Sequence, residues 1–448
     1  MSTWTIIHPD TLGYHAQLIQ WSEKYRLIPG LVNLNARYGL QSNWFLGCAL
    51  FSFKFTGGQA LLYLNSAVLF WFIIFAVNKI NEYIRGNSGL GNGFLWILLL
   101  GLSFWSYTQV RLMATSASPD FFAAILIWTI LYIFLRKKTQ PEISYPDFFI
   151  IALLCGTAVT IKLSSLPVLF ISAALLYLLF RQKKFKHMLM TGAIVVITVL
   201  PFLVRNTITS GYPLFPAVYG SFQVDWKLDE TTTRQIGDYV KVYSRTKFSY
   251  SNPHNKDVLQ MNWAEWIPIW WKNLSTADKT IFLLLVASIL AAIATIKKIS
   301  GLDHKRIIAL FVCLTGIIFW FTLAPDPRFG FGFIFGFIGI TGSMILREKA
   351  LVSLAVLKKI LMVSVWVINL LLLVYLVYRF KNFYSSEQWL KPLGTEKVAY
   401  KTIICDGIKT NMQLTLRGCG DSAIPCVYDS CKDFQLRGTT IKEGFKDR

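Results

Sequence analysis

Long stretches with few or no charged residues recur along this chain, and they restrict its fold more than any other feature of the sequence. A helix needs about 20 such residues to cross a hydrocarbon layer about 30 Å thick. The composition agrees, because 54% of the residues are hydrophobic and only 15% are charged. The sequence therefore excludes a soluble enzyme and predicts an all-α polytopic membrane protein. The expected spans, about ten in number, lie near residues 59–78, 94–110, 119–136, 147–161, 163–180, 188–204, 278–296, 307–323, 329–346 and 354–378.

Basic residues are distributed unequally between the two sets of loops that these spans create. The loops of one face hold Lys79, Arg85, Arg136, Lys137, Lys138, Arg181, Lys183, Lys184, Lys186, Lys297, Lys298, Lys305, Arg306, Arg347, Lys349, Lys358 and Lys359. The short loops of the other face hold only Arg111, Lys162 and Arg328. The positive-inside rule makes the first face cytoplasmic. This membrane topology explains the formal charge of +21. The expected partner is therefore a lipid bilayer and not a nucleic acid.

This topology divides the chain into five parts. We expect a first outer segment with interfacial helices, six membrane helices, a large outer loop, four more membrane helices and an outer tail. Their bounds are 1–58, 59–204, 205–277, 278–378 and 379–448. Because the outer segment at the start has no span before it, it is either a translocated tail or the remainder of a longer protein, and we favour the second interpretation. The apolar run 43–53 is too short to span.

Four of the seven cysteines lie in the tail, at Cys405, Cys419, Cys426 and Cys431. Clustered cysteines in a small segment on the outer side favour two disulfides. A zinc site is the alternative, but the tail has neither a C-x-x-C pair nor a histidine. The pairing stays open.

Charged residues that lie at or beside the outer ends of spans are the candidate functional residues, because ionisable groups at membrane depth are costly. We expect them to face one shared cavity. They are Asp10, His15, Arg37, Arg111, Asp120, Lys162, Arg205, Asp326 and Arg328.

Asp10 precedes an amphipathic pattern in which Tyr14, Leu18, Trp21 and Tyr25 share one face. The pattern predicts a helix along the membrane surface. Asp10 is then either the N-cap of that helix or a general base at the lip of a membrane cavity. Metal ligation by His8, Asp10 and His15 is a third interpretation, although their spacing matches no specific motif.

The other candidates also have structural alternatives. Ser118-Pro119-Asp120 fits an ordinary helix start. Lys162 either extends to the lipid headgroups or binds a phosphate. Arg328, fixed by the two prolines of Pro325-Asp326-Pro327, either binds a phosphate or pairs with Asp326.

Taken in order, these motifs resemble bacterial membrane glycosyltransferases of the GT-C superfamily. The resemblance depends on Asp10, on Asp120, on the Ile161-Lys162-Leu163-Ser164 break and on the outer motifs around Arg205 and Arg328. More closely, the chain looks like a group of bacterial multi-span proteins with a cysteine-containing tail. The motifs for this second likeness are Asp10-x-x-x-Tyr14-His15, Pro29-Gly30-Leu31-x-Asn33-Leu34, Arg37-x-Gly39 and Leu436-Arg437-Gly438.

The resemblance implies a GT-C-like bundle in a bacterial inner membrane, with its active face outside. Such an enzyme takes a sugar from a polyprenyl-phosphate donor and transfers it to a glycan, lipid or protein acceptor of the cell envelope. It implies that Asp10 is the catalytic base and that His15, Arg37 and Asp120 support it or bind the acceptor. Lys162, Arg205 and Arg328 are then the ligands of the donor phosphate. Many enzymes of this superfamily have a second acidic residue beside the first, whereas the neighbours of Asp10 are Pro9 and Thr11. No cofactor is therefore certain, and a divalent metal stays an open alternative.

Two other functions stay open at this stage. One is a polymerase or ligase that handles whole lipid-linked glycans, and the other is a non-catalytic membrane or transport component. A transporter is expected to have ionisable groups near the bilayer midplane and related halves, whereas these charges gather at one face. The sequence has no Walker A, G-x-G-x-x-G, H-E-x-x-H or G-x-S-x-G element.

Overall fold

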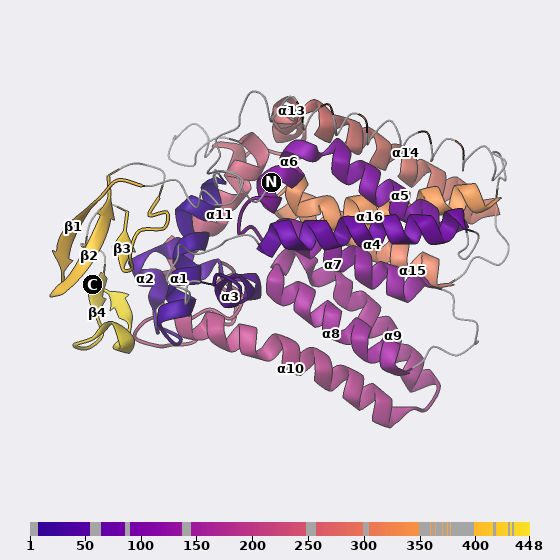
Figure 1. Ribbon diagram of the computed structural model, residues 1–448. Coiled ribbons are helices and arrows are strands. Elements are labelled where there is room, and N and C mark those ends of the chain that lie inside the picture. Colours follow the sequence, from indigo (N-terminus) through magenta and orange to yellow (C-terminus); the bar gives the residue numbers. More distant parts are fainter. Residues whose placement is uncertain are drawn as a thin grey trace.

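The structure is a computed structural model. It describes residues 8–53, 64–85, 90–136, 145–247, 257–298, 304–348, 398–414, 418–428, 431 and 434–448, together with five isolated positions between 359 and 377. The described chain is mostly helical and has three parts: an N-terminal helical segment, a bundle of long apolar helices and a small C-terminal region of strands (Figure 1).

The N-terminal segment consists of short helices at one end of the bundle. In chain order they are a π-helical turn (Thr11–His15), α1 (Ala16–Lys24), α2 (Leu31–Leu34), a 3₁₀ turn (Ala36–Gly39) and α3 (Asn43–Leu50). The amphipathic pattern places a helix correctly, but polar as well as apolar residues of this helix are buried. Leu18 and Trp21 are buried, and so are the polar Gln17 and Gln20, because another part of the protein covers this helix.

The bundle contains the apolar helices that the sequence predicts. They are α4 (Leu64–Ile84), α5 (Leu90–Trp105), α7 (Asp120–Leu135), α8 (Tyr145–Ile161), α9 (Leu169–Arg181), α10 (Phe185–Ser210), α14 (Thr276–Lys298), α15 (His304–Leu323) and α16 (Pro327–Glu348). A 3₁₀ turn (Leu163–Val168) leads into α9, and a short helix α6 (Tyr107–Ala114) follows α5.

Six segments in the described chain are long and apolar enough to cross a membrane. They are Leu64–Ile84, Leu163–Arg181, Phe185–Ser210, Thr276–Thr295, His304–Leu323 and Pro327–Ile345. The predicted spans at 94–110, 119–136 and 147–161 correspond to shorter apolar helices, and the span at 354–378 lies outside the described residues. The membrane character of the chain is therefore confirmed, while the number of about ten spans is not.

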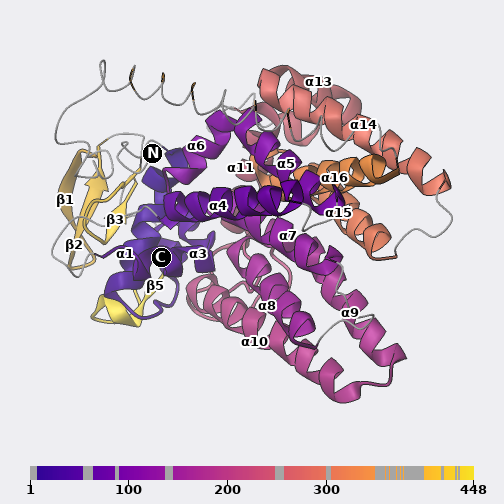
Figure 2. The ribbon, with the colours of Figure 1, turned by 45° about the vertical axis from the view of Figure 1, so that its right-hand side comes forward.

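Helix α16 occupies the centre of the bundle (Figures 1 and 2). Of its most apolar window, 78% is buried against other helices. Glycines make this contact possible, because a side chain at Gly332 would collide with Ile127 of α7. The indole Nε1 of Trp128 also donates a hydrogen bond of 3.0 Å to the Gly332 carbonyl. Because α16 is held in the centre of the bundle, its first residues are fixed at one end of the bundle.

The region expected as a large outer loop is partly helical. Helix α10 continues past the predicted end at residue 204 to Ser210, and α11 (Glu230–Thr246), a 3₁₀ turn (Asp257–Leu259) and α13 (Trp263–Asn273) follow. Trp266 and Trp270 are buried, while Trp263 and Trp271 remain exposed. The tryptophans therefore act in part as packing residues.

The C-terminal region contains five short strands: β1 (Tyr400–Cys405), β2 (Ile408–Gln413), β3 (Cys426–Val427), β4 (Phe434–Leu436) and β5 (Phe445–Asp447). β1 and β2 are antiparallel, β3 joins β2 in parallel, and β4 pairs with β5. A 3₁₀ turn (Ile441–Glu443) precedes β5. Two disulfides, Cys405–Cys431 and Cys419–Cys426, confirm the predicted state of the four tail cysteines and supply the pairing.

The tail region packs directly on the N-terminal segment, and this contact explains why α1 is buried. The Gln17 side chain donates to the carbonyls of Gly420 and Ser422, at 3.1 and 2.8 Å. The Gly420 amide donates to the Leu12 carbonyl at 2.8 Å, and the Phe445 amide donates to the Pro29 carbonyl at 3.0 Å. Figure 1 shows the strands beside α1 and α2, and Figure 2 shows them beside α1, at the same end of the bundle. The two ends of the described chain therefore lie on one side.

Candidate functional site

A cavity of about 410 Å³ lies where the N-terminal segment meets α6, α11 and the first turns of α14 and α16. Its walls combine aromatic and charged side chains from segments far apart in the sequence. The lining residues are Pro9, Asp10, Tyr14, Arg37, Leu40, Gln109, Leu112, Tyr239, Val240, Tyr243, Lys247, Asn273, Ser275, Asp278, Asp326, Arg328 and Phe329.

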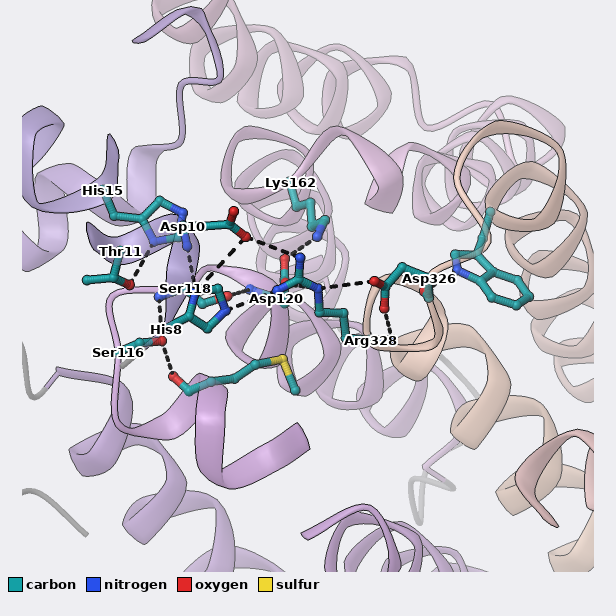
Figure 3. A network of polar contacts seen from close by, with 12 residues as sticks. His8, Asp10, Thr11, His15, Ser116, Ser118, Asp120, Lys162, Asp326 and Arg328 are labelled. Atoms are coloured by element: carbon teal, nitrogen blue, oxygen red, sulfur yellow. Dashed lines mark hydrogen bonds and ion pairs between the residues drawn. The ribbon is translucent and has the colours of Figure 1, made fainter. Parts of the chain in front are cut away.

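Arg328, in the first turn of α16, is the centre of a charged network in the cavity wall (Figure 3). Its Nη2 lies 3.1 Å from Oδ2 of Asp10, and its Nε lies 3.6 Å from carboxylate oxygens of both Asp120 and Asp326. Its Nη1 lies 3.0 Å from Nε2 of His8. A guanidinium can only donate, so His8 accepts at Nε2 and is neutral.

Lys162 joins this network through Asp120. Its ammonium pairs with the Asp120 carboxylate and lies 3.6 Å from the centre of the Phe329 ring. Its side chain is only 17% exposed. The predicted extension of Lys162 to the lipid headgroups is therefore wrong.

The loop before α16 is held rigidly. Nε1 of Trp320 donates to the Asp326 carbonyl, and Nε1 of Trp270 donates to the Pro325 carbonyl, both at 2.7 Å. Lys247, which directly follows α11, forms an ion pair of 2.6 Å with Asp326. The predicted pairing of Asp326 with Arg328 is present as well, so Arg328 is positioned by its own loop.

The network is balanced in charge. Three carboxylates (Asp10, Asp120, Asp326) face three cations (Lys162, Lys247, Arg328). Buried charges persist only where they are compensated in this way. The arrangement stabilises a charged cavity wall at the end of an apolar bundle.

Asp10 does not act as a helix cap, which removes the structural alternative for its side chain. No side-chain cap hydrogen bond is present at this position. The carboxylate faces the cavity and is 29% exposed. Burial alone would raise the pKa of Asp10, but the adjacent Arg328 guanidinium outweighs it and holds this pKa well below its usual range. Asp10 is therefore an ionised, oriented hydrogen-bond acceptor.

Ser118 and Asp120 combine the two interpretations made from the sequence. The Ser118 hydroxyl accepts a long contact of 3.4 Å from the Asp120 amide, as expected at a helix start. The Asp120 carboxylate, however, contacts both Lys162 and Arg328. Asp120 therefore begins α7 and also connects two cations that lie far apart in the sequence.

The two histidines of the first segment lie beside Asp10, with ring centres 5.8 Å apart. Burial lowers the pKa of His8 to about 4 and that of His15 to about 3. His15 contacts the Thr11 hydroxyl at 3.1 Å and does not line the cavity. The described residues contain no group of three histidine, cysteine or acidic side chains that could hold a metal, and Arg328 occupies the outward nitrogen of His8.

Arg37 lines the cavity on the side of the tail. Its guanidinium lies 4.8 Å from the centre of the Tyr239 ring of α11 and 5.6 Å from that of Tyr428 in the tail. The Tyr428 hydroxyl donates to the Gly13 carbonyl at 2.7 Å. Arg37 thus joins three parts of the chain at the cavity.

Arg205 is not brought to the charged network, contrary to the prediction of one shared cavity for it, Lys162 and Arg328. Its guanidinium contacts the side chains of Gln41 and Asn43 and the Ser42 carbonyl. It does not line the cavity, because α10 lies at the periphery of the bundle and ends beside α2 (Figure 1). Lys162 does not line the cavity either, but its ammonium lies 3.6 Å from the centre of the Phe329 ring, which does. Of these three cations, Arg328 alone forms part of the cavity wall.

Sequence reasoning missed the contribution of residues 239–278. Tyr239, Tyr243, Lys247 and Asp278 all line the cavity. Of these four residues, only Asp278 belongs to a recognisable sequence pattern. Ser275-x-x-Asp278 before an apolar run is typical of a helix start. The Ser275 hydroxyl does donate to Oδ2 of Asp278, at 2.6 Å. Its other oxygen, Oδ1, is buried and accepts no hydrogen bond from the described residues.

Residues 1–335 match a family described as "Domain of unknown function (DUF8201)". The chain belongs to this family. No curated protein and no solved structure matches the chain. The matched range contains every residue that lines the cavity, from Pro9 to Phe329, whereas the strands of the tail lie outside it.

Proposed function

We propose that this protein is a membrane glycosyltransferase. It moves a sugar from a polyprenyl-phosphate-linked donor to a hydroxyl-bearing acceptor of the cell envelope, and Asp10 is its general base. The observation that carries the proposal is the position of the Asp10 carboxylate. It is free of any capping role, faces a cavity at the end of the apolar bundle and is fixed by Arg328.

The cavity has the size and wall chemistry that such a reaction needs. Ligand pockets typically measure about 300–1,000 Å³ and combine apolar walls with a few polar groups. The rings of Tyr14, Tyr239 and Tyr243 supply aromatic surface for a sugar. A site at the end of membrane helices can take a prenyl chain from the lipid and an acceptor from water.

The chemistry follows from the state of Asp10. The acceptor hydroxyl donates its hydrogen bond to the carboxylate while its oxygen attacks the anomeric carbon of the sugar. The bond from that carbon to the phosphate oxygen breaks, the phosphate leaves with the electron pair, and the proton passes to Asp10. Because the lowered pKa of Asp10 makes it a weak base in the resting state, proton transfer proceeds as bond formation acidifies the hydroxyl.

The proposed location is a bacterial inner membrane, with the cavity on the outer face. It is supported by the unequal distribution of basic residues and by the two disulfides of the tail, which packs on the cavity-bearing segment. Disulfides persist in oxidising compartments.

Turnover of synthetic donors tests the function. The full chain in nanodiscs is incubated with a panel of polyprenyl-phosphate monosaccharides and an envelope extract as acceptor, and mass spectrometry measures released prenyl phosphate. We expect the Asp10→Asn variant to lose about 10²–10⁴-fold in rate, which is the typical contribution of a general base.

The matched control is Asp229→Asn. Asp229 caps α11 at an exposed position through a 2.9 Å bond from the Thr232 amide, and asparagine caps about as well as aspartate. This control is expected to keep the full rate. Normal turnover by Asp10→Asn would refute the role of Asp10, and binding without turnover of any donor would favour a non-catalytic membrane component.

A further inference from the structure

The cations that line the cavity differ in their partners. Arg328 is paired with Asp10 at 3.1 Å, and Lys247 is paired with Asp326 at 2.6 Å. Arg37 forms no ion pair with a carboxylate of the described residues and contacts aromatic rings instead. A phosphate that binds Arg328 must displace Asp10 and leave a carboxylate uncompensated, which is costly. A phosphate that binds Arg37 breaks no ion pair.

The geometry of Arg37 is also suited to an anion. Its guanidinium is planar and presents its donors at the edge. The rings of Tyr239 and Tyr428 lie 4.8 and 5.6 Å from the guanidinium carbon. Because these two rings come from α11 and from the tail, they hold the group in place. Such a fixed planar fork can bind two phosphate oxygens at once.

A second group in the cavity indicates the other end of the ligand. Asp278 is only 4% exposed, and its Oδ1 accepts no hydrogen bond from the described residues. An unpaired acceptor of this kind is costly unless a ligand supplies a donor. A ligand that satisfies both groups has an anionic end and a hydroxyl-bearing end.

We propose that the cavity binds a glycosyl phosphate ester in one orientation, with its phosphate on the Arg37 guanidinium and a sugar hydroxyl on the carboxylate of Asp278. The identity of the sugar end rests on the function proposed above. The anion site at Arg37 does not, because it can be measured as binding without turnover. This assignment moves the donor phosphate away from Lys162, Arg205 and Arg328.

Binding of farnesyl phosphate, with farnesol as the uncharged comparison, tests the anion site. Affinities are measured for the full chain in phosphatidylcholine nanodiscs. Loss of a charged hydrogen bond corresponds to about a tenfold change or more. We expect this loss for farnesyl phosphate in Arg37→Gln, partial recovery in Arg37→Lys, and no change for farnesol. The control Arg234→Gln removes an exposed arginine of α11 that pairs with Glu230 and is expected to bind normally.

Three results would overturn the anion site: normal affinity in Arg37→Gln, an equal loss in Arg234→Gln, or an equal loss for farnesol. Competition with inorganic phosphate and with phosphatidic acid identifies the source of the anion. If phosphatidic acid displaces the bound probe at the same concentration as farnesyl phosphate does, the anion that this site binds is a lipid headgroup and not a prenyl donor. Failure of all donors to turn over, with Arg37-dependent binding intact, would refute only the proposed function.

The orientation is tested with farnesyl phosphoglucose in the same assay. We expect Asp278→Ala to weaken binding of this sugar ester by about tenfold while farnesyl phosphate binds as before, because only the ester has a hydroxyl for the Asp278 side chain. The conservative Asp278→Asn keeps a carbonyl acceptor and is expected to restore part of the affinity. An equal loss for both probes, or none for either, would overturn the orientation.

Discussion

Helices α10 and α16 are both long and apolar, but they lie in opposite environments. Of the most apolar window of α10 only 11% is buried within the protein, whereas 78% of that of α16 is buried. Helix α10 exposes large side chains such as Leu189 and Ile197, while α16 presents glycines to its neighbours. In a bilayer, small residues allow helix backbones to approach closely. Apolar length thus identifies a membrane helix, and the small residues decide which helix becomes central.

This difference has a consequence for function. The arginine in the first turn of α16, Arg328, is surrounded by three carboxylates and lines the cavity. The arginine near the end of α10, Arg205, contacts only neutral groups among the residues that the structure describes. Two arginines that look alike in the sequence therefore have different surroundings, because their helices occupy different positions in the bundle.

Loss of Arg328 should have the largest effect on stability. Arg328→Gln removes the cation that contacts the buried carboxylates of Asp120 and Asp326 as well as the partly exposed Asp10, and removal of one partner of a buried pair costs about 3–5 kcal/mol. Arg205→Gln removes contacts to neutral groups and should cost less than about 2 kcal/mol. Thermal unfolding of both variants in detergent measures the difference. Equal losses would remove the distinction between the two helix ends.

Acid should weaken the same end of α16. His8 has a pKa of about 4 in the folded protein, against 6.5 in the unfolded chain, because it is buried. Arg328 and Lys162 lower this pKa further, while Asp10 and Asp120 oppose them. The unfolded chain therefore takes up a proton first as the pH falls. The stabilisation is fully present above pH 6.5 and is lost toward pH 4, by on the order of 3 kcal/mol.

A pH series of unfolding temperatures tests this effect, with His8→Gln as the comparison. Glutamine keeps an acceptor for Arg328 but does not titrate. Its stability should fall less steeply between pH 6.5 and 4, although His15, whose pKa is also lowered, contributes to both proteins. Parallel curves would assign the acid sensitivity to other groups.

A bulky residue in α16 should destabilise the bundle, and the same change in α10 should not. Gly332→Leu places atoms against Ile127 and within reach of the Ala124 Cα, which lies 3.3 Å from the position of a new Cβ. Overpacking of this kind costs about 1–3 kcal/mol. A Cβ at Gly192 of α10 meets nothing within 4 Å, so Gly192→Leu should change stability by less than about 0.5 kcal/mol. Similar unfolding temperatures for the two variants would contradict the central position of α16.

The smallest effect is expected at the hydrogen bond between α7 and α16. Trp128→Phe keeps most of the aromatic volume but loses the 3.0 Å bond to the Gly332 carbonyl, which should cost about 1 kcal/mol. The control Trp71→Phe changes a 66% exposed side chain on α4 and should be neutral. If both variants unfold at the wild-type temperature, this hydrogen bond contributes little to the stability of the contact between α7 and α16.

Local properties of the sequence were sufficient to predict much of the architecture. Apolar runs marked the helices because the length of a membrane span is set by the bilayer. The break at Lys162 and the start of α7 at Asp120 lie where the sequence places them. Four clustered cysteines predicted two disulfides. Asp10 and Arg328 were identified as candidates because charges beside apolar runs need an explanation.

The tertiary structure alone decided how these parts meet. The disulfide pairing, the burial of α1 beneath the tail and the contact of Arg328 with residues 8, 10 and 120 all join segments far apart in the chain. Hydropathy and cap patterns describe each helix separately, whereas ion pairs and cavities depend on which faces pack together. The central place of α16 and the peripheral place of α10 therefore separate Arg328 from Arg205, because packing is a property of the whole bundle.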